Sequence, residues 1–442
     1  MRNSETSGPL KVNAIAGTYV VTLGFDLPQV ECVGLLGFSI HRADHIENQS
    51  YFLQGMKAFA ETDPGFPPGS LYTTREHPIQ GFQWADYSAK PGYKYTYTVT
   101  ALKGTPRNLI PHASASVDVT TESPENGDHD VYFNRGVAAS QEYVRRFGNK
   151  RPEEVQNNAA WDWLSRGLYE ALVEFITSCV PGENSLRIAA YEFHYDELLK
   201  VIKETIDKGV DIQAIYDARK KSPGDTNTKK VKKFKLVPFC TKRKNGVSYI
   251  SHNKFIVKLD KNENAISVWT GGTNFSDGGI FGHSNVAHVV EDPVVADNFL
   301  KYWEELKKDP ETEDMRDISE QLSPLPGTPP PKGTTVVFSP RQSLDSLNLY
   351  ATIASAANDA LMMTFAFGLN PLFKDVYKNG QAAFRLALLE KKTRSMKDGP
   401  EKVKEEKDIQ KLRKQPENVF AIGNFVRTNK FDGWVKETLS NS

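Results

Sequence analysis

The order of strand-like and helix-like segments repeats on the two sides of a proline-rich stretch at 323–333. Before this stretch, a buried-strand pattern, an amphipathic helix pattern that ends at a glycine and another strand pattern occupy 186–193, 196–209 and 210–217. After it, the same kinds of segment recur in the same order at 361–367, 370–377 and 384–389. Two weaker pairs precede these, 131–134 with 336–340 and 164–177 with 348–357, the second with helical apolar spacing. We interpret the recurrence as an internal duplication of an α/β layer structure.

The N-terminal region has a different pattern. Residues 1–125 contain short alternating runs separated by turns rich in proline and glycine, which is typical of an all-β domain. A polar segment at 121–128 ends this region, and the proline-rich stretch reads as a linker. A chain of 442 residues is long enough for two or more domains. The boundaries predict three of them, at 1–125, 126–322 and 334–442.

The clearest strand pattern of the N-terminal region lies at 91–101. Its apolar residues alternate with polar ones, as a half-buried strand requires; they are Tyr93, Tyr95, Tyr97 and Val99. The segment Gln83–Tyr87 comes before this strand, and one last strand pattern follows it. This arrangement resembles a fibronectin type III or related immunoglobulin-like sandwich. Such a resemblance implies a module that binds a partner or spaces domains, and an irregular β-domain is the alternative.

Residues that carry chemistry lie between the two halves, in the stretch 251–292. His252 and Lys254 stand two residues apart in an alternating pattern, so we expect both side chains to project from one face of a strand. Asn274 follows a turn made by Gly271 and Gly272, where the backbone can approach a ligand closely. An imidazole, an ammonium group and an amide that converge from adjacent strands suit attack on phosphorus. The imidazole is a nucleophile near neutral pH, and the other two groups hold phosphate oxygens as charge builds.

The surroundings of this motif predict chemistry without a metal or another cofactor. No second carboxylate and no cysteine cluster lies near it, and the three cysteines match no zinc or redox spacing. Glu192, in the strand pattern 186–193, is a candidate for orienting His252, because a carboxylate commonly orients a catalytic imidazole. A glutamate at the surface or at the edge of the core is the equal alternative.

The constellation resembles the HxK(x)4D…GSxN signature of the phospholipase D superfamily. The resemblance covers the fold from about 126 to 442 and is most specific from His252 to Asn285. It implies a phosphodiesterase in which one histidine forms a phosphohistidine that water or an alcohol then resolves. A second HxK motif supplies the histidine that acts as general acid. His252 would be the nucleophile or the acid, with Lys254 and Asn274 on the phosphate.

The glycine turn and the residues behind it complete the implied site. Gly271 and Gly272 would lie against the substrate, and Asn285 lies in the strand that packs behind the site in this family. Two positions depart from the signature. The aspartate of the signature is expected at Leu259, whereas Asp260 comes one residue later, and the serine of the signature is replaced by Gly272. Because the family's aspartate is mostly structural, the shift leaves the assignment in place.

The second histidine is missing from the duplicated half. A second HxK is expected near Val426 or later, yet no histidine follows His288. Three explanations stay open. The chain is cut short before its second motif, which we favour slightly; two copies pair so that their His252 residues face each other; or the second half is degenerate and the protein inactive.

Charge and hydropathy leave the substrate class open. Lysine plus arginine equals aspartate plus glutamate, at 55 each, so no global basic field indicates a nucleic acid. This weakly favours a phospholipid. A locally basic segment at 219–244 makes a nuclease the alternative. No run of apolar residues predicts a transmembrane segment and no leader is recognised, so we expect a cytoplasmic protein. A non-catalytic binding protein with half a site is the rival from another class.

Overall fold

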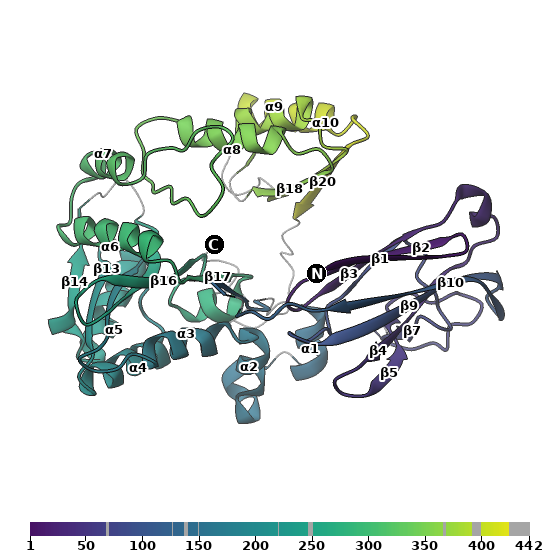
Figure 1. The fold of residues 1–442 in the computed structure, drawn as a ribbon, viewed down its shortest axis with the longest axis horizontal. Coiled ribbons are helices and arrows are strands. Elements are labelled where there is room, and N and C mark those ends of the chain that lie inside the picture. The colour runs from purple at the N-terminus through teal and green to yellow at the C-terminus, as the bar shows by residue number, and fades with distance from the viewer. Residues whose placement is uncertain are drawn as a thin grey trace. The chain divides into compact units, whose positions relative to one another are not determined.

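The computed structural model describes residues 1–67, 70–125, 127–136, 140–148, 150–219, 221–245, 251–365, 368–390 and 399–423. These residues form two compact units, Met1–Tyr132 and Phe133–Ser442. The N-terminal unit is built from strands, and the second unit combines helices with two sheets (Figure 1).

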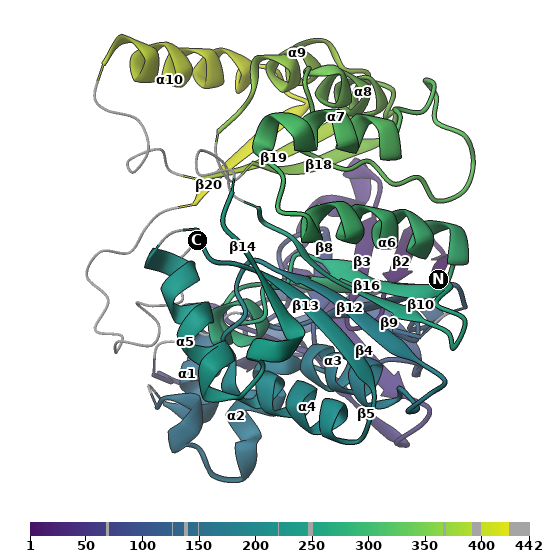
Figure 2. The same cartoon turned by 90° about the vertical axis from the view of Figure 1, so that its left-hand side faces the viewer.

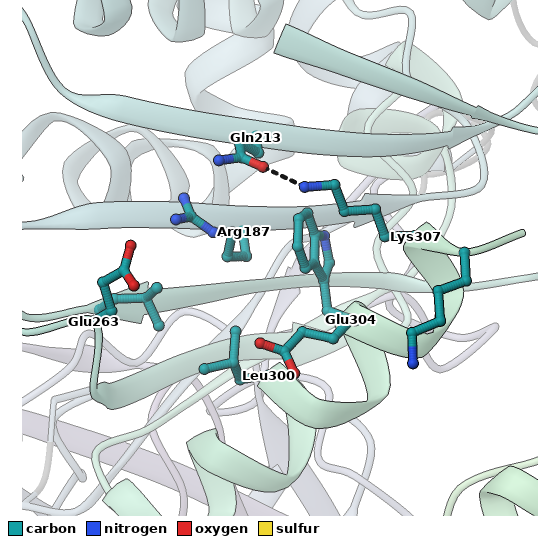
Figure 3. A pocket seen from close by; sticks show the side chains of 9 residues that line it. Arg187, Gln213, Glu263, Leu300, Glu304 and Lys307 are labelled. Atoms are coloured by element: carbon teal, nitrogen blue, oxygen red, sulfur yellow. Dashed lines mark hydrogen bonds between the residues drawn. The ribbon is translucent and has the colours of Figure 1, made fainter.

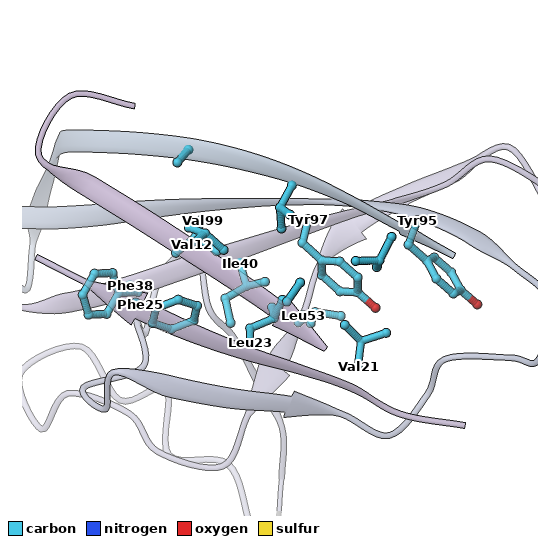
Figure 4. Close-up of a cluster of buried hydrophobic side chains, with 14 of the residues drawn as sticks. Val12, Val21, Leu23, Phe25, Phe38, Ile40, Leu53, Tyr95, Tyr97 and Val99 are labelled. Atoms are coloured by element: carbon cyan, nitrogen blue, oxygen red, sulfur yellow. The ribbon is translucent and has the colours of Figure 1, made fainter. Parts of the chain in front are cut away.

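The N-terminal unit consists of antiparallel sheets that enclose one core. The first sheet contains β1 (Arg2–Ser7), β2 (Leu10–Ala16), β3 (Val21–Asp26) and β8 (Gln83–Asp86) in that order. The second contains β10 (Asn108–Thr120), β9 (Lys94–Thr105), β4 (Gly37–Asp44) and β5 (Gln49–Phe52), and β6 (Gln54–Gly55) pairs with β7 (Tyr72–Thr73). Side chains from both four-stranded sheets form a single apolar cluster (Figure 4). The alternation expected at 91–101 is confirmed for Tyr95, Tyr97 and Val99 on β9, which are all 0% exposed, whereas Tyr93 lies just before the strand and is partly buried.

A buried ion pair joins the two sheets of this unit. Arg42 on β4 donates from Nη1 to Oδ2 of Asp86 on β8 at 2.7 Å. The hydroxyl of Tyr97 donates to the same carboxylate oxygen at 2.8 Å, and Arg42 and Asp86 are only 5% and 4% exposed. Burial and the neighbouring carboxylate raise the pKa of Tyr97, which therefore stays a neutral donor. The network satisfies polar groups that the core would otherwise leave without partners.

Asp86→Ala is expected to destabilise the N-terminal unit by about 3–5 kcal/mol, because it leaves the Arg42 charge buried without its partner. Urea unfolding followed by the tyrosine signal of this unit measures the change. Asp26→Ala is the matched control, since Asp26 lies on β3 of the same sheet and is exposed. Equal losses in the two variants would contradict this account of the pair.

The second unit is organised around a seven-stranded mixed sheet. In spatial order its strands are β11 (His129–Phe133), β17 (Val286–Val290), β16 (Ala265–Gly271), β15 (Lys254–Leu259), β12 (Ser185–Ala190), β13 (Asp211–Asp217) and β14 (Cys240–Arg243). β12, β13 and β14 run parallel, whereas β15 pairs antiparallel with both β12 and β16. The strands expected at 186–193 and 210–217 are β12 and β13. This part of the chain therefore has an α/β fold, and its sheet contains both parallel and antiparallel strand pairs.

Helices cover both faces of this sheet. α6 (Pro293–Lys307) lies on one face, while α3 (Leu168–Thr177) and α4 (Asp196–Asp207) lie on the other (Figure 2). Residues of α6 and of α7 (Thr312–Leu322) share a core with β12, β15 and β16. The start of α6 follows from its sequence, because the Asp292 side chain accepts hydrogen bonds from the backbone N–H groups of Val294 and Val295. The smaller helices are α1 (Gln141–Phe147), α2 (Ala159–Ser165) and α5 (Thr226–Lys233).

Two expectations from the sequence need correction. The single helix expected at 164–177 is divided between α2 and α3, because Arg166 and Gly167 adopt φ angles of 50° and 94° that interrupt a right-handed helix. The segment 336–340 forms no strand. Instead, the backbone N–H of Phe338 donates to Ser323 Oγ, and the Phe338 ring stacks on Tyr302 in the core beside α6.

The C-terminal part carries a parallel sheet of three strands, β18 (Ala360–Phe365), β19 (Phe384–Glu390) and β20 (Asn418–Gly423). α8 (Asp345–Ser355), α9 (Pro371–Asn379) and α10 (Pro400–Leu412) accompany it, and α8 and α9 contribute to its own apolar cluster. The order β18–α9–β19–α10–β20 matches the order β12–α4–β13–α5–β14. The position near Val426 at which a second HxK motif was expected, but where the sequence has no histidine, lies outside the described residues.

Candidate active site

The motif residues gather where three neighbouring strands begin or end. β15 begins at Lys254, which lies opposite Ala190 at the end of β12. Just beyond that pair, the backbone N–H of Tyr191 donates to the carbonyl of Asn253 at 2.7 Å. β16 ends at Gly271, and the segment after it turns back so that Phe275 pairs with Phe193. Antiparallel pairing of β15 with both neighbours therefore brings His252, Lys254, Asn274 and Glu192 to one end of the sheet.

His252 lies in the short stretch before β15 and not within the strand itself. Its ring packs edge-on against the ring of Tyr191, with 4.5 Å between ring centroids. The pKa of His252 is lowered to about 4. Desolvation by surrounding atoms is the larger cause, and the positive charge of Lys254 is the smaller one. The side chain nevertheless keeps an exposed face. A neutral, accessible imidazole at neutral pH has a lone pair available for nucleophilic attack.

Lys254 is the first residue of β15 and is only 7% exposed. Its Nζ donates to the backbone carbonyl of His252 at 2.8 Å and lies 5.8 Å from the centroid of the Tyr191 ring. Burial lowers the pKa of Lys254 to about 8, although the charge of Glu192 acts in the opposite direction. Most Lys254 side chains are therefore protonated at pH 7. A buried ammonium group next to the imidazole is suited to bind an anion.

Asn274 and the glycine turn form the third side of the site. The Asn274 Oδ1 atom is buried and has no hydrogen-bond partner among the residues that the structure describes. Gly271 has a φ of 138°, and a Cβ there would lie 2.3 Å from the carbonyl oxygen of Val286, so no other residue fits. Gly272 is exposed, and a Cβ there would lie 3.1 Å from Asn285 Oδ1. The turn thus presents backbone and one amide toward the end of the sheet.

Asn285 supports the loop behind this turn. Its Nδ2 donates to the carbonyl of Gly279 at 2.6 Å, and its backbone N–H donates to Asn134 Oδ1 at 2.7 Å. Asn134 in turn donates from Nδ2 to the carbonyls of Ile280 and His283. Asn285 therefore holds backbone in place, immediately before β17 and not within it, and its role behind the site stays a prediction.

Glu192 interacts with the far side of the turn. Its Oε2 accepts a hydrogen bond from the hydroxyl of Ser276, and its charge acts on Lys254. A role in orienting His252 stays a prediction. The sequence reasoning did not single out Ser276 or Tyr191, which contacts both His252 and Lys254. The position of Tyr191 next to Glu192 at the end of a buried strand was the available signal.

Asp260 makes a local turn. Its Oδ1 accepts from the backbone N–H groups of Asn262 at 2.9 Å and Asn264 at 2.8 Å. Hydrogen bonds from Asn264 lower the pKa of this carboxyl group. Leu259, which occupies the position of the signature aspartate, is 2% exposed and belongs to the core beside α6. Asp260 therefore stabilises the connection between β15 and β16 through backbone hydrogen bonds.

The described part of the chain contains no group of three or more histidine, cysteine, aspartate or glutamate side chains arranged to hold a metal ion. Its helices are also too short or too polar to cross a bilayer. The side chains described above bring an imidazole, an ammonium group, an amide and a carboxylate to this end of the sheet.

Residues 172–307, from α3 to the end of α6, match the family model described as "Cardiolipin synthase, PLD-like domain". Residues 172–307 therefore form a domain of the phospholipase D superfamily, and the resemblance seen in the sequence is confirmed for this part of the chain. The match does not extend to the N-terminal unit.

Solved structures give partial and distant likenesses. Nuc, a phospholipase D family member from Salmonella typhimurium, is 24% identical over 31% of this chain and 84% of its own, with a TM-score of 0.27. NucT from Helicobacter pylori is 18% identical over 34% of this chain and 91% of its own, with a TM-score of 0.28. Phosphatidylserine synthase from Haemophilus influenzae Rd KW20 is 10% identical over 58% and 73%, with a TM-score of 0.39. No curated protein matches the chain.

Proposed function

We propose that the chain is a phosphodiesterase that forms a phosphohistidine at His252 and needs no metal. The observation that carries the proposal is the neutral, accessible imidazole of His252 beside the buried ammonium group of Lys254. Asn274 supplies an amide at the same end of the sheet. These three groups suit a phosphate with one nucleophile and two oxygen-binding contacts.

The proposed reaction has two steps. An imidazole nitrogen of His252 attacks phosphorus, a P–N bond forms, and one P–O bond breaks to release an alkoxide or phenolate. Lys254 and Asn274 hold the non-bridging oxygens while charge builds on them. Water then attacks the phosphohistidine, its oxygen bonds to phosphorus, the P–N bond breaks, and one proton is released. The products are a phosphomonoester and an alcohol, and His252 returns to its neutral form.

The released alkoxide needs a proton, and a second histidine would be the natural donor. No histidine follows His288 in the sequence. We infer that the acid comes from His252 of a second copy of the chain. A binding protein that keeps half a site is the remaining alternative. Turnover that rises with the fraction of dimer would favour paired copies, and turnover that does not change with this fraction would contradict them.

The matching order of strands and helices on the two sides of the linker supports an internal duplication in the second unit. We propose that β18, β19 and β20 correspond to β12, β13 and β14. For the N-terminal unit we propose an immunoglobulin-like module of the fibronectin type III kind, supported by its two antiparallel sheets around one core. Its proposed role is to bind a partner or to space domains.

Bis(p-nitrophenyl) phosphate in EDTA tests the proposed function. We expect turnover by the purified chain, because p-nitrophenolate leaves without protonation and so does not require a second histidine. A burst of about one p-nitrophenolate per chain should precede slower turnover, since the chain alone activates water poorly. No turnover and no burst at any protein concentration would contradict the proposal and favour the binding protein.

The pH profile of kcat/KM for this substrate follows from the two shifted groups. His252 is the nucleophile only when neutral, so activity should fall below about pH 4. Lys254 binds the phosphate only when charged, so activity should fall above about pH 8. If His252 and Lys254 had their ordinary pKa values, kcat/KM would instead fall below about pH 6.5 and above about pH 10.5. Initial rates from pH 3.5 to 11 distinguish the two profiles.

A phospholipid is the weakly favoured substrate, and a nucleic acid is the alternative. The balanced charge of the chain supports the first, and the lysines of α5 and its neighbours support the second. We propose a cytoplasmic location. Cleavage of DNA and of phospholipid at low and high salt separates the substrates, because binding to a nucleic acid weakens steeply with salt.

A further inference from the structure

A small pocket of about 210 Å³ lies beside His252. His252 and Ser251 line it on one side, and Arg219 and Arg243 line it from the ends of β13 and β14. The pocket is smaller than the ~300–1,000 Å³ cavities that enclose whole drug-sized ligands. It therefore has room for one group of a substrate whose phosphate lies at His252.

Arg243 is the unusual residue of this pocket. It is 5% exposed, and its Nε is buried without a hydrogen-bond partner in the described part of the chain. Its Nη2 donates to the carbonyl of Pro310 at 3.1 Å, and its Nη1 lies 3.5 Å from an oxygen of Asp309. That carboxylate also accepts hydrogen bonds from the backbone N–H groups of Lys244 and Asn245. The Arg243 charge is therefore only partly compensated.

Arg219 differs from Arg243 because the charge of Arg219 is compensated by a neighbouring carboxylate. Its Nε donates to Oδ2 of Asp217 at 2.6 Å, and both side chains are buried. Burial lowers the pKa of Arg243, which means that desolvation of its cation is not fully offset by its neighbours. A buried guanidinium group whose charge is only partly compensated is stabilised by a bound anion. Arginine stays charged, and its planar guanidinium group can donate two parallel hydrogen bonds to one anion.

The rest of the lining combines apolar side chains with the polar residues Thr312 and Ser339. Leu306 of α6 and Met315 of α7 line the pocket, together with Tyr302. One face of the Tyr302 ring is already stacked on Phe338, at 4.2 Å between centroids and 9° between planes. The described lining offers no second aromatic ring on which a nucleic-acid base could stack. The pocket thus favours a short chain that ends in an anion over a nucleotide.

We propose that this pocket binds an anionic substituent, a carboxylate or a phosphate, carried by the small headgroup of the phosphodiester substrate. This proposal rests on the proposed function of His252, because the headgroup is defined by its link to the phosphate that His252 attacks. Two sources share this chemistry, a phospholipid in a membrane and a water-soluble glycerophosphodiester.

A second buried arginine provides a matched control (Figure 3). Arg187 on β12 is 7% exposed and lines a different pocket with Glu263, Glu304 and Lys307. Its Nη1 lies 2.9 Å from Asp211, so its charge is compensated. Arg187→Met and Arg243→Met thus remove similarly buried guanidinium groups from the same sheet, but only the second changes the proposed pocket.

Binding is measured by calorimetry on protein that carries His252→Ala, so that the result does not depend on turnover. The probes are glycerophosphoserine and glycerophosphoethanolamine, which differ by one carboxylate. We expect about tenfold tighter binding of the serine compound, as one charge-assisted hydrogen bond provides. Arg243→Met should abolish this preference, Arg243→Lys should keep part of it, and Arg187→Met should leave it unchanged. Vesicles with the same two headgroups, compared by sedimentation, show whether membrane lipid is also a source.

Equal affinity for the two glycerophosphodiesters would overturn the proposal. Loss of the preference in Arg187→Met as well as in Arg243→Met would also overturn it, because a general effect on the sheet would then be the cause. Arg243-dependent binding of the dinucleotide pTpT without any headgroup preference would assign the pocket to nucleic acid instead. A preference on the His252→Ala background together with no turnover by the unmodified chain would keep the pocket and refute the catalytic function.

Discussion

His252→Ala is expected to lower kcat/KM for bis(p-nitrophenyl) phosphate by about 10⁴-fold or more, because removal of a nucleophile eliminates the covalent pathway. The exposed ring of His252 packs against one neighbouring ring, that of Tyr191, and its backbone carbonyl still accepts from Lys254 in the variant. The free energy of unfolding should therefore change little. Initial rates and urea unfolding of the same preparation measure both quantities.

His288→Ala is the matched control for this variant. His288 lies on β17 of the same sheet, opposite Thr270 of β16, and has no part in the proposed chemistry. We expect near-normal kcat/KM from it. Residual activity of His252→Ala within tenfold of the unmodified chain would refute His252 as nucleophile, whatever the behaviour of the control.

Lys254→Met is expected to reduce kcat/KM by about 10²–10³-fold, the usual effect of removing one group that stabilises charge in the transition state. It should also change how stability depends on pH. The pKa of Lys254 lies near 8 in the folded protein and near its ordinary 10.5 when unfolded. Above pH 8 the unfolded state binds more protons, so the unmodified protein gains stability as pH rises.

The size of this gain follows from the two pKa values. Between pH 7 and pH 9.5 the unmodified protein should gain about 2 kcal/mol relative to Lys254→Met. Urea unfolding of the second unit at the two pH values measures the difference. Lys258→Met on the same strand is the control, because Lys258 is less buried and donates to Ser178 outside the site. The same pH response in unmodified protein and Lys254→Met would contradict the account of a desolvated ammonium group.

The periodicity of apolar residues in the sequence predicted the helices and strands that have one face in solvent and the other in the core. The apolar residues of α4 and the alternating residues of β9 are buried as their spacing indicates. The sequence also predicted neighbouring strands with a glycine turn, and β15 and β16 are antiparallel neighbours with Lys254 at the start of the first and Gly271 at the end of the second. Local sequence was sufficient in these cases because the pattern of each element decides which face is buried.

Tertiary contacts decided what periodicity could not. His252 was expected within a strand, yet β15 begins only at Lys254. The low pKa values of both residues arise mainly from burial in the folded chain, which for Lys254 outweighs the opposite effect of the Glu192 charge. The pocket beside His252 brings Arg243 next to Leu306 and Met315, which share no local motif with it. Such neighbours are set by the packing of α6 and α7 on the sheet and leave no spacing signal in the chain.

Trapping of the covalent intermediate tests the proposed role of His252. The chain is mixed with a radiolabelled phosphodiester, quenched in alkali and digested, and the labelled peptide is sequenced by mass spectrometry. Phosphohistidine is stable in alkali and labile in acid, so the label should survive the quench, disappear in acid, and map to His252. A label on another residue, or an equal amount of label on the His252→Ala variant, would contradict the mechanism.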